Sequence, residues 1–279
     1  MSKPRANAAA AYSPAIRQRI LSFGRWFVVV SMIAFGVQQV VLERFVTRIV
    51  PGLPDWIPAP TALAYIMGGG LIAASCLILF DRKHTRGVAV ALGLLIIVAF
   101  VVIHAPRIAP EPLNAGLWTF GLKCLSLAAC AFALAASSPT SLSLPSSRGF
   151  ARTVSDRWLL TLAATLLGVF MMFCCVLHFI FAEFVTVLVP SWIPGGAFWT
   201  YFSAIALFAG GLGLLIPRTR RLAAAFSGGM ILVWVLVLHI PRALTVRDAN
   251  ETTAVFEALA FGGLALIIAC VPRQLTSAA

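Results

Sequence analysis

Charged side chains are scarce in this sequence: they make up 11% of the 279 residues, whereas 61% are hydrophobic. A water-soluble domain uses roughly 25% charged residues to cover its surface, so the composition excludes an ordinary soluble globule. Acidic residues are scarcest, with nine Asp and Glu against 21 Lys and Arg. The net charge of +12 does not indicate nucleic-acid binding, because the basic residues form short clusters between long apolar runs, as they do in bilayer proteins.

Several catalytic and metal-binding motifs are also absent. The six cysteines lie inside apolar runs and include no CxxC pair, so packing is their ordinary role. The sequence contains no phosphate-binding loop, no nucleophile triad and no zinc motif. The first apolar stretch is not followed by a small-residue cleavage site, and we therefore expect it to be a membrane span rather than a signal peptide.

Eight apolar runs are long enough to cross a hydrocarbon layer about 30 Å thick, which takes roughly 20 helical residues. These runs are 26–42, 59–80, 87–106, 113–136, 158–182, 195–217, 222–241 and 252–272. Two of them carry one charge each, Lys123 and Glu257. We therefore predict an all-α, polytopic membrane protein with eight transmembrane helices and both termini on one side.

The charges between the spans predict the orientation. The side that carries the termini has 15 basic and two acidic residues, whereas the opposite side has five basic and six acidic residues. Positive charge is retained in the cytoplasm. We therefore predict that both termini are cytoplasmic and that the protein is a multi-pass component of a bacterial-type plasma (inner) membrane.

The sequence repeats itself at an offset of 134 to 139 residues. Segment 102–107 (VIHAPR) returns at 237–242 (VLHIPR), segment 45–47 (FVT) at 184–186, and segment 56–58 (WIP) at 192–194. An even number of spans per copy makes the copies face the same way. We predict a disordered tail at 1–15, four-helix units at 16–136 and 151–273, a Ser/Pro-rich linker at 137–150, and a tail at 274–279.

Four motifs occur in the same order in each copy. They are a long first helix ending near VPxWIP, a Trp or Tyr early in the second helix, a short basic loop, and a third helix ending in HxPR. This set resembles the DoxX-like (DoxX/DoxD) family of integral membrane proteins, once per copy and most clearly in the second. The family takes its name from membrane subunits of an archaeal thiosulfate:quinone oxidoreductase. The resemblance implies a four-helix fold and an association with membrane redox partners, and it fixes no activity.

Polar residues in or beside the spans are few, and they fall at matched positions of the two copies. The pairs are Gln39 with His178, Arg44 with Glu183, His104 with His239, Arg107 with Arg242, and Lys123 with Glu257. All are expected in the outer half of the membrane. By default, such histidines cap helix ends, and such arginines extend to carbonyls or lipid phosphates.

An ionisable group in the hydrocarbon costs at least about 2.5–3.5 kcal/mol unless it is paired or hydrated. Three arrangements meet this cost for Glu257. It pairs with Arg242 or His239 in its own copy, it pairs with Lys123 across the pseudo-two-fold axis, or it lines a polar cavity whose ligand completes the set.

The second copy supplies the candidate site. We predict one outward-facing pocket formed by His178, Glu183, His239, Arg242 and Glu257, with the aromatic residues Trp192, Trp199 and Tyr201. Such a set suits a quinone head group, because a donor can meet each carbonyl oxygen and a carboxylate can accept a proton. The first copy has no second histidine and no acid at the matching positions, so a single working site is expected in the second.

Two metal hypotheses rest on less. A haem b could be ligated from both sides by His178 and His239, but two histidines on different helices are the only support for it. A Cu(I) ion held by Met171, Cys174, Cys175 and His178 has only a stripe at helical spacing, and these are also ordinary packing residues. We therefore predict no metal site and regard quinone as the candidate cofactor.

The expected function is that of a redox-linked, quinone-interacting membrane subunit or anchor, with a peripheral oxidoreductase as its partner. Two alternatives stay open: a small-molecule transporter or lipophile-binding membrane protein, and a structural or assembly factor without a catalytic site. The sequence leaves open whether the protein is an enzyme, and it indicates no nucleic-acid partner.

Overall fold

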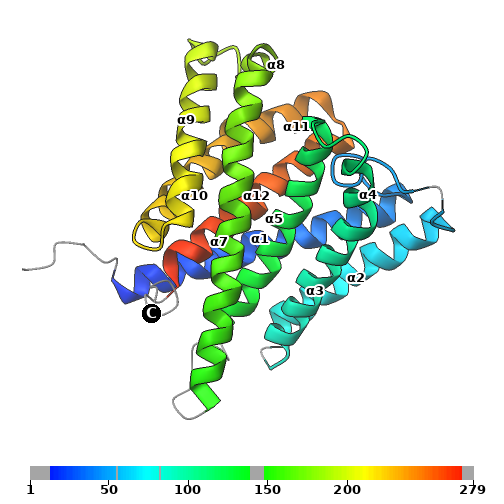
Figure 1. The fold of residues 1–279 in the computed structure, drawn as a ribbon, viewed down its shortest axis with the longest axis vertical. Helices are drawn as coiled ribbons and strands as arrows, with labels where there is room; N and C mark the ends of the chain where they lie inside the picture. The colour runs from blue at the N-terminus through cyan, green and yellow to red at the C-terminus, as the bar shows by residue number, and fades with distance from the viewer. Residues whose placement is uncertain (1–12, 55, 82, 139–147, 272–279) are drawn as a thin grey trace, which may run out of the picture.

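The computed structural model describes residues 13–54, 56–81, 83–138 and 148–271. Regular structure in these ranges is helical throughout. They contain eight helical stretches long and apolar enough to cross a membrane, namely Pro14–Leu42, Pro60–Phe80, Thr85–Ile108, Ala115–Ala136, Ser155–Ile180, Gly196–Leu215, Arg220–Val246 and Ala249–Cys270 (Figure 1). The predicted all-α fold with eight spans is confirmed, and the chain is a multi-pass membrane protein. The predicted tails and linker lie largely outside the described residues.

The first copy contains four spans. Its elements are α1 (Pro14–Leu42), α2 (Pro60–Phe80), α3 (Thr85–Ala99), the π-helical turn η1 (Phe100–His104), α4 (Ala105–Ile108) and α5 (Ala115–Ala136). Ser13 caps helix α1, since its hydroxyl accepts a hydrogen bond from the Ile16 amide at 3.3 Å, and the Asn114 side chain caps α5 by accepting from the Leu117 amide at 3.2 Å. Both caps satisfy amides that the first helical turn leaves free.

The second copy repeats this order. Its elements are α7 (Arg148–Ile180), α8 (Ala182–Leu188), α9 (Gly196–Leu215), α10 (Arg220–Trp234), η2 (Val235–His239), α11 (Ile240–Val246) and α12 (Ala249–Cys270). The π-helical turns η1 and η2 begin 135 residues apart, and each ends at a histidine of the repeated HxPR motif. The repeat in the sequence is therefore also a repeat in the backbone.

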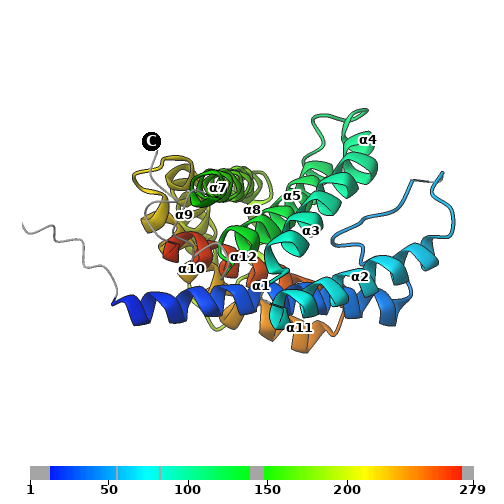
Figure 2. The same ribbon diagram turned by 90° about the horizontal axis from the view of Figure 1, so that it is seen from below.

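The two copies are interlocked rather than separate. Helix α1 packs extensively on α12 of the other copy, and α7 packs in the same way on α5. Within each copy, the first span packs on the second and the third on the fourth, but the first and fourth spans barely touch. Helices α5 and α12 meet at the centre, as the two views of the fold illustrate (Figures 1 and 2).

Small residues allow the copies to approach closely. A Cβ atom added to Gly24 of α1 would lie 2.8 Å from the carbonyl oxygen of Gly263 of α12, and one added to Gly263 would lie 2.6 Å from the carbonyl oxygen of Gly24. At the matching positions of the α5–α7 contact stand Ala129 and Ala163, both fully buried. Small side chains at both contacts are typical of close helix packing in membranes.

An ion pair also joins the copies at the end of the molecule where the chain starts. Arg86 of α3 contacts the buried carboxylate of Asp156 of α7, with two N–O distances of 3.0 Å. Near this contact in sequence, His84 forms a hydrogen bond of 2.6 Å with Asp81, which holds the pKa of the Asp81 carboxyl below its usual value. The copies are therefore held together by charge as well as by packing.

The long first span of each copy ends before the apolar sequence does. Helix α1 stops at Leu42, where Glu43 adopts a positive φ of 55°, and α7 stops at Ile180, after which the short α8 follows. As one straight helix, the sequence from Trp158 to Pro190 would be about 48 Å long, and the break after Ile180 interrupts it. Trp56 and Trp192 are exposed after these breaks, as residues at a membrane interface would be.

Candidate functional site

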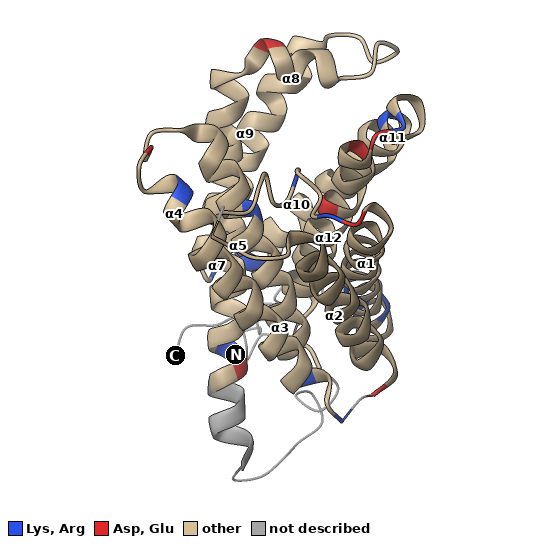
Figure 3. Cartoon of the chain, turned by 90° about the vertical axis from the view of Figure 1, so that its right-hand side faces the viewer, with Lys and Arg blue, Asp and Glu red and all other residues tan. Residues whose placement is uncertain are grey.

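Lys123 and Glu257 occupy the same position in the two copies and meet at the centre of the molecule. Each is the ninth residue of a 22-residue helix, α5 or α12, which places both about 12 Å along the span from its outer end. The Lys123 ammonium donates a hydrogen bond of 3.1 Å to Oε2 of Glu257. Of the three arrangements open for Glu257, the structure therefore contains the pair across the pseudo-two-fold axis. Figure 3 shows how few charged positions occur along the helices.

A second cation reaches the same oxygen. Nε of Arg48 donates to Oε2 of Glu257 at 2.7 Å. Glu257 is 3% exposed, so its charge lies away from water and depends on these two partners. The other carboxylate oxygen, Oε1, is buried and has no hydrogen-bond partner among the described residues.

Arg48 belongs to the segment 43–59 between α1 and α2, which we call the cap loop. Its attachment to α12 is continued by Asn250, whose side-chain oxygen accepts hydrogen bonds from the Thr47 hydroxyl at 3.0 Å and the Arg48 amide at 3.1 Å. Just before the loop, Gln38 of α1 accepts from the Thr253 hydroxyl at 3.1 Å. The first copy therefore places its loop over the outer end of a helix of the second copy.

The second copy does not repeat this attachment. Thr186 of α8 matches Thr47 in the sequence repeat, but its hydroxyl lies 3.0 Å from that of Thr200 of α9, in its own copy. Helix α8 packs on α9 and α7 and stands apart from α12 in Figures 1 and 3. The two outer connections have similar sequences and different partners.

His239 lies near the Lys123–Glu257 pair, and Arg242 bonds to another acid, Glu251. His239 ends η2 and is within electrostatic range of Arg48, Lys123 and Glu257. Arg242 forms two hydrogen bonds to the carboxylate of Glu251, at 2.7 Å and 3.2 Å. Of the predicted pocket residues, His239 therefore lies within electrostatic range of Glu257, whereas Arg242 pairs with Glu251 rather than Glu257.

The remaining members of the predicted pocket lie elsewhere. Glu183 is exposed on α8, because the break after Ile180 turns that segment out of the α7 span. His178 is half-buried, and its Nδ1 lies 2.7 Å from the carbonyl oxygen of Cys174 on its own helix. Trp192 and Tyr201 are exposed, and Trp199 donates to the carbonyl of Pro194 at 3.2 Å. The structure therefore divides the predicted pocket into a central cluster and an α7–α9 group.

The first-copy counterparts are also dispersed. His104 is buried and its ring stacks on Phe100, with 6.3 Å between centroids. Arg107 donates to the carbonyl oxygen of Gly52 in the cap loop at 2.9 Å. Gln39 is buried, and its Oε1 has no partner in the part of the chain that the structure describes. The cap loop is therefore bonded to α4 through Arg107 and to α12 through its own Arg48.

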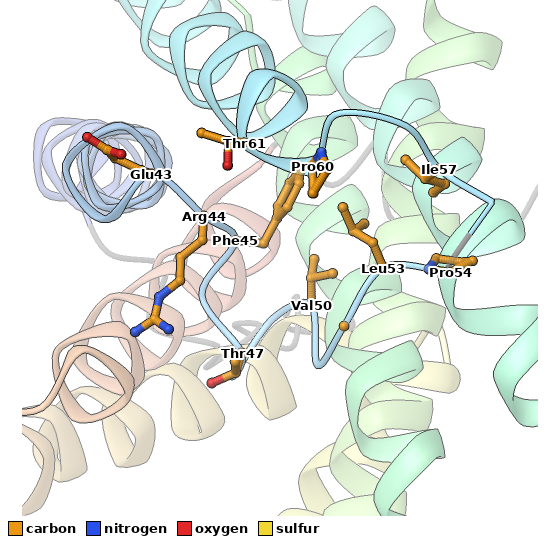
Figure 4. Close-up of a pocket in the computed structure, with 11 residues that line it drawn as sticks. Glu43, Arg44, Phe45, Thr47, Val50, Leu53, Pro54, Ile57, Pro60 and Thr61 are labelled. Atoms are coloured by element: carbon orange, nitrogen blue, oxygen red, sulfur yellow. The ribbon is translucent and has the colours of Figure 1, made fainter.

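A cavity of about 510 Å³ is formed by the cap loop and the start of α2 (Figure 4). Its lining is mostly apolar, with Phe45, Val50 and Leu53 among its residues and Thr61 from the start of α2. Arg44 also lines it and extends on the same side of the loop as Thr47 (Figure 4). Cavities of roughly 300–1,000 Å³ with a mainly apolar lining and a few polar groups are typical of small-molecule sites.

The sequence reasoning did not select Arg48 as a site residue. It follows the apolar run of the first span, as an ordinary charge of an outer loop does. The repeat contained a signal: segment 45–48 reads FVTR, whereas its copy at 184–187 reads FVTV. A charge present in one copy of an otherwise apolar motif marks Arg48 as a specific feature of the first copy.

The structure adds no support to the two metal hypotheses. Among the described residues, no three His, Cys, Asp or Glu side chains lie close enough to hold a metal ion. The proposed Cu(I) stripe also faces two ways, since Met171 lies against Gly210 of α9 and Cys174 is within electrostatic range of Lys123 of α5.

Comparison with known proteins gives one match. Residues 167–275 match a family model described as a domain of unknown function (DUF8561). This segment begins inside α7 and includes α8 to α12, so it covers most of the second copy and less than half of the chain. No curated protein and no solved structure matches the chain. The resemblance to the DoxX-like family therefore stays a prediction.

Proposed function

We propose that this protein binds a lipophilic small molecule in the outer half of the membrane, as a carrier or a binding component. The observation that supports this most is the cavity formed by the cap loop and the start of α2, since its volume and mainly apolar lining suit such a ligand. The cavity is lined by residues of the first copy, and one of them, Thr47, is also bonded to Asn250 of the second copy. The cap loop, attached to α12 through Arg48 and Asn250, forms most of the lining.

A cavity-filling substitution tests this proposal. Leu53→Trp places an indole ring in the cavity, and we expect the purified variant to lose lipophiles that co-purify with the wild type, as measured by mass spectrometry of extracted lipids. Leu113→Trp is the matched control, because Leu113 is 96% exposed on another outer loop. Equal lipophile content in the two variants and the wild type would contradict the proposal.

We also propose that the membrane is a bacterial-type inner membrane and that both termini are cytoplasmic, on the basis of the 15 basic and two acidic residues on that side. In a cysteine-free background, Leu113→Cys should react with an impermeant thiol reagent in intact cells, and Arg218→Cys should react only after permeabilisation. The reverse pattern would place the termini outside.

A second candidate function is a redox-linked, quinone-binding membrane subunit that serves a peripheral oxidoreductase. The unpartnered Oε1 of Glu257 beside His239 favours it, because a buried acceptor without a partner costs about 1–3 kcal/mol or more and a quinol hydroxyl would supply the donor. The resemblance to DoxX-like proteins points the same way. Quinone in the lipid extract, with loss of that quinone in Glu257→Gln, would favour this candidate, and its absence would reject it.

A further inference from the structure

The two contacts between the copies carry different charges at matched positions, at the end of the molecule where the chain starts. At one contact, Arg86 of α3 is paired with Asp156 of α7. The repeat offset is 139 residues in the first span and 135 in the third, so Asp156 matches Arg17 of α1 and Arg86 matches Arg221 of α10. Two arginines therefore occupy the positions that hold an ion pair at the other contact.

The structure brings these two arginines to the same end of α12. Helix α12 packs on both α1 and α10, as α5 packs on both α7 and α3. Nε of Arg221 donates to the carbonyl oxygen of Ala269 at 3.0 Å, and Arg17 and Arg221 both lie within electrostatic range of Cys270, the last residue of α12. The guanidinium of Arg17 has no hydrogen bond or ion pair with a described residue. Like charges placed in this way repel each other unless an anion joins them.

The acidic side chains at this end of the molecule are already paired. The sequence places two there, Asp81 and Asp156. Asp81 lies 2.6 Å from His84, and Asp156 lies 3.0 Å from Arg86. Both pairs stand at the start of α3, away from the junction of α1, α10 and α12. An anion at that junction is therefore not a side chain of this part of the protein.

The surroundings of Arg17 favour a lipid phosphate as the anion. Arg17 precedes the buried residues Leu21 and Gly24 at helical spacing, so it lies on the face of α1 that meets α12. Phe23 and Trp26, on the neighbouring face, are 58% and 52% exposed, as side chains that contact lipid are. Basic sites between spans bind lipid head groups, and guanidinium groups match the geometry of phosphate oxygens.

We propose that Arg17 and Arg221, at the junction of α1, α10 and α12, bind the phosphate of an anionic phospholipid. The phosphate supplies the negative charge that Asp156 supplies at the other contact, and it stabilises the packing of the two copies. The site is at the opposite end of α1 from the cavity of the cap loop, so it is independent of the lipophile-binding proposal.

Thermal unfolding of the full-length protein in dodecyl maltoside tests this site. We expect phosphatidylglycerol to raise the unfolding temperature of the wild type by about 2–4 °C more than phosphatidylcholine does, because a ligand of the folded state stabilises it. Arg17→Asp recreates the ion pair of the other contact. It should raise the unfolding temperature without lipid and remove the extra response to phosphatidylglycerol. Arg17→Gln should remove that response without the gain, and it keeps the test decisive if the aspartate variant does not fold.

Arg19→Asp is the matched control, since it makes the same change of charge at an exposed residue two positions along α1, where the side chain points away from that of Arg17. It should keep the wild-type response. Equal responses of the wild type to the two lipids, or a full response in Arg17→Gln, would overturn the proposal. Loss of the response in Arg19→Asp as well would show an effect of net charge and overturn it too. A rise with inorganic phosphate but not with phosphatidylglycerol would assign the site to a soluble anion and reject the lipid.

Discussion

At the scale of single residues, the centre of the molecule depends on the carboxylate of Glu257. The sequence predicted that an ionisable residue this deep in a span needs a partner, and it included Lys123 among three arrangements because the two positions match in the repeat. It did not predict that Arg48 shares the same oxygen, since sequence distance does not show that a loop after the first span reaches over the last. The position of Glu183 depends on the break after Ile180, which sequence patterns place only approximately.

The shared carboxylate predicts unequal costs for its three members. Glu257→Met leaves Lys123 and Arg48 as unpaired neighbouring cations, and we expect it to destabilise the protein by about 3–5 kcal/mol. Lys123→Met or Arg48→Met should cost less, because the other cation remains on Glu257. Thermal unfolding in detergent would measure this order.

Compensating substitutions make the test sharper. The double variant Lys123→Met/Glu257→Met should recover only part of the loss because Arg48 stays unpaired, and adding Arg48→Met should recover more. Glu183→Met, at an exposed acid, is the control and should stay within about 0.5 kcal/mol of the wild type. Full recovery in the double variant would show that Arg48 is not part of the network.

At the scale of elements, the apolar runs predicted all eight spans because length and hydropathy decide what a bilayer accepts. They did not predict the π-helical turns at Phe100–His104 and Val235–His239, since the same residues suit an α-helix equally well. Such turns occur frequently at functional sites, and here they end at His104 and His239. The cap loop and α8 show the same limit: identical threonines, Thr47 and Thr186, bond to different copies.

At the scale of the whole molecule, the duplication produced interlocked copies whose outer ends differ. The repeat offset showed two units, but an offset carries no information about which helices touch, and the packing of α1 on α12 and of α7 on α5 emerges only in three dimensions. The first copy lends its cap loop to the second, so the site combines Arg48 and Lys123 of one copy with Glu257 and His239 of the other. The lipophile-binding proposal depends on the cap loop, because the loop forms most of the cavity lining.

The attachment of the cap loop to α12 can be tested directly by disulfide cross-linking. In a background with the six native cysteines replaced, Thr47→Cys and Asn250→Cys replace side chains whose oxygens lie 3.0 Å apart, and we predict a cross-link on mild oxidation in the membrane. The control pair is Thr186→Cys and Gly116→Cys. In the repeat, Thr186 of the second copy matches Thr47, and Gly116 of the first copy matches Asn250. This pair should remain reduced. A cross-link in the control pair with none between positions 47 and 250 would contradict the arrangement in which the first copy closes over the second.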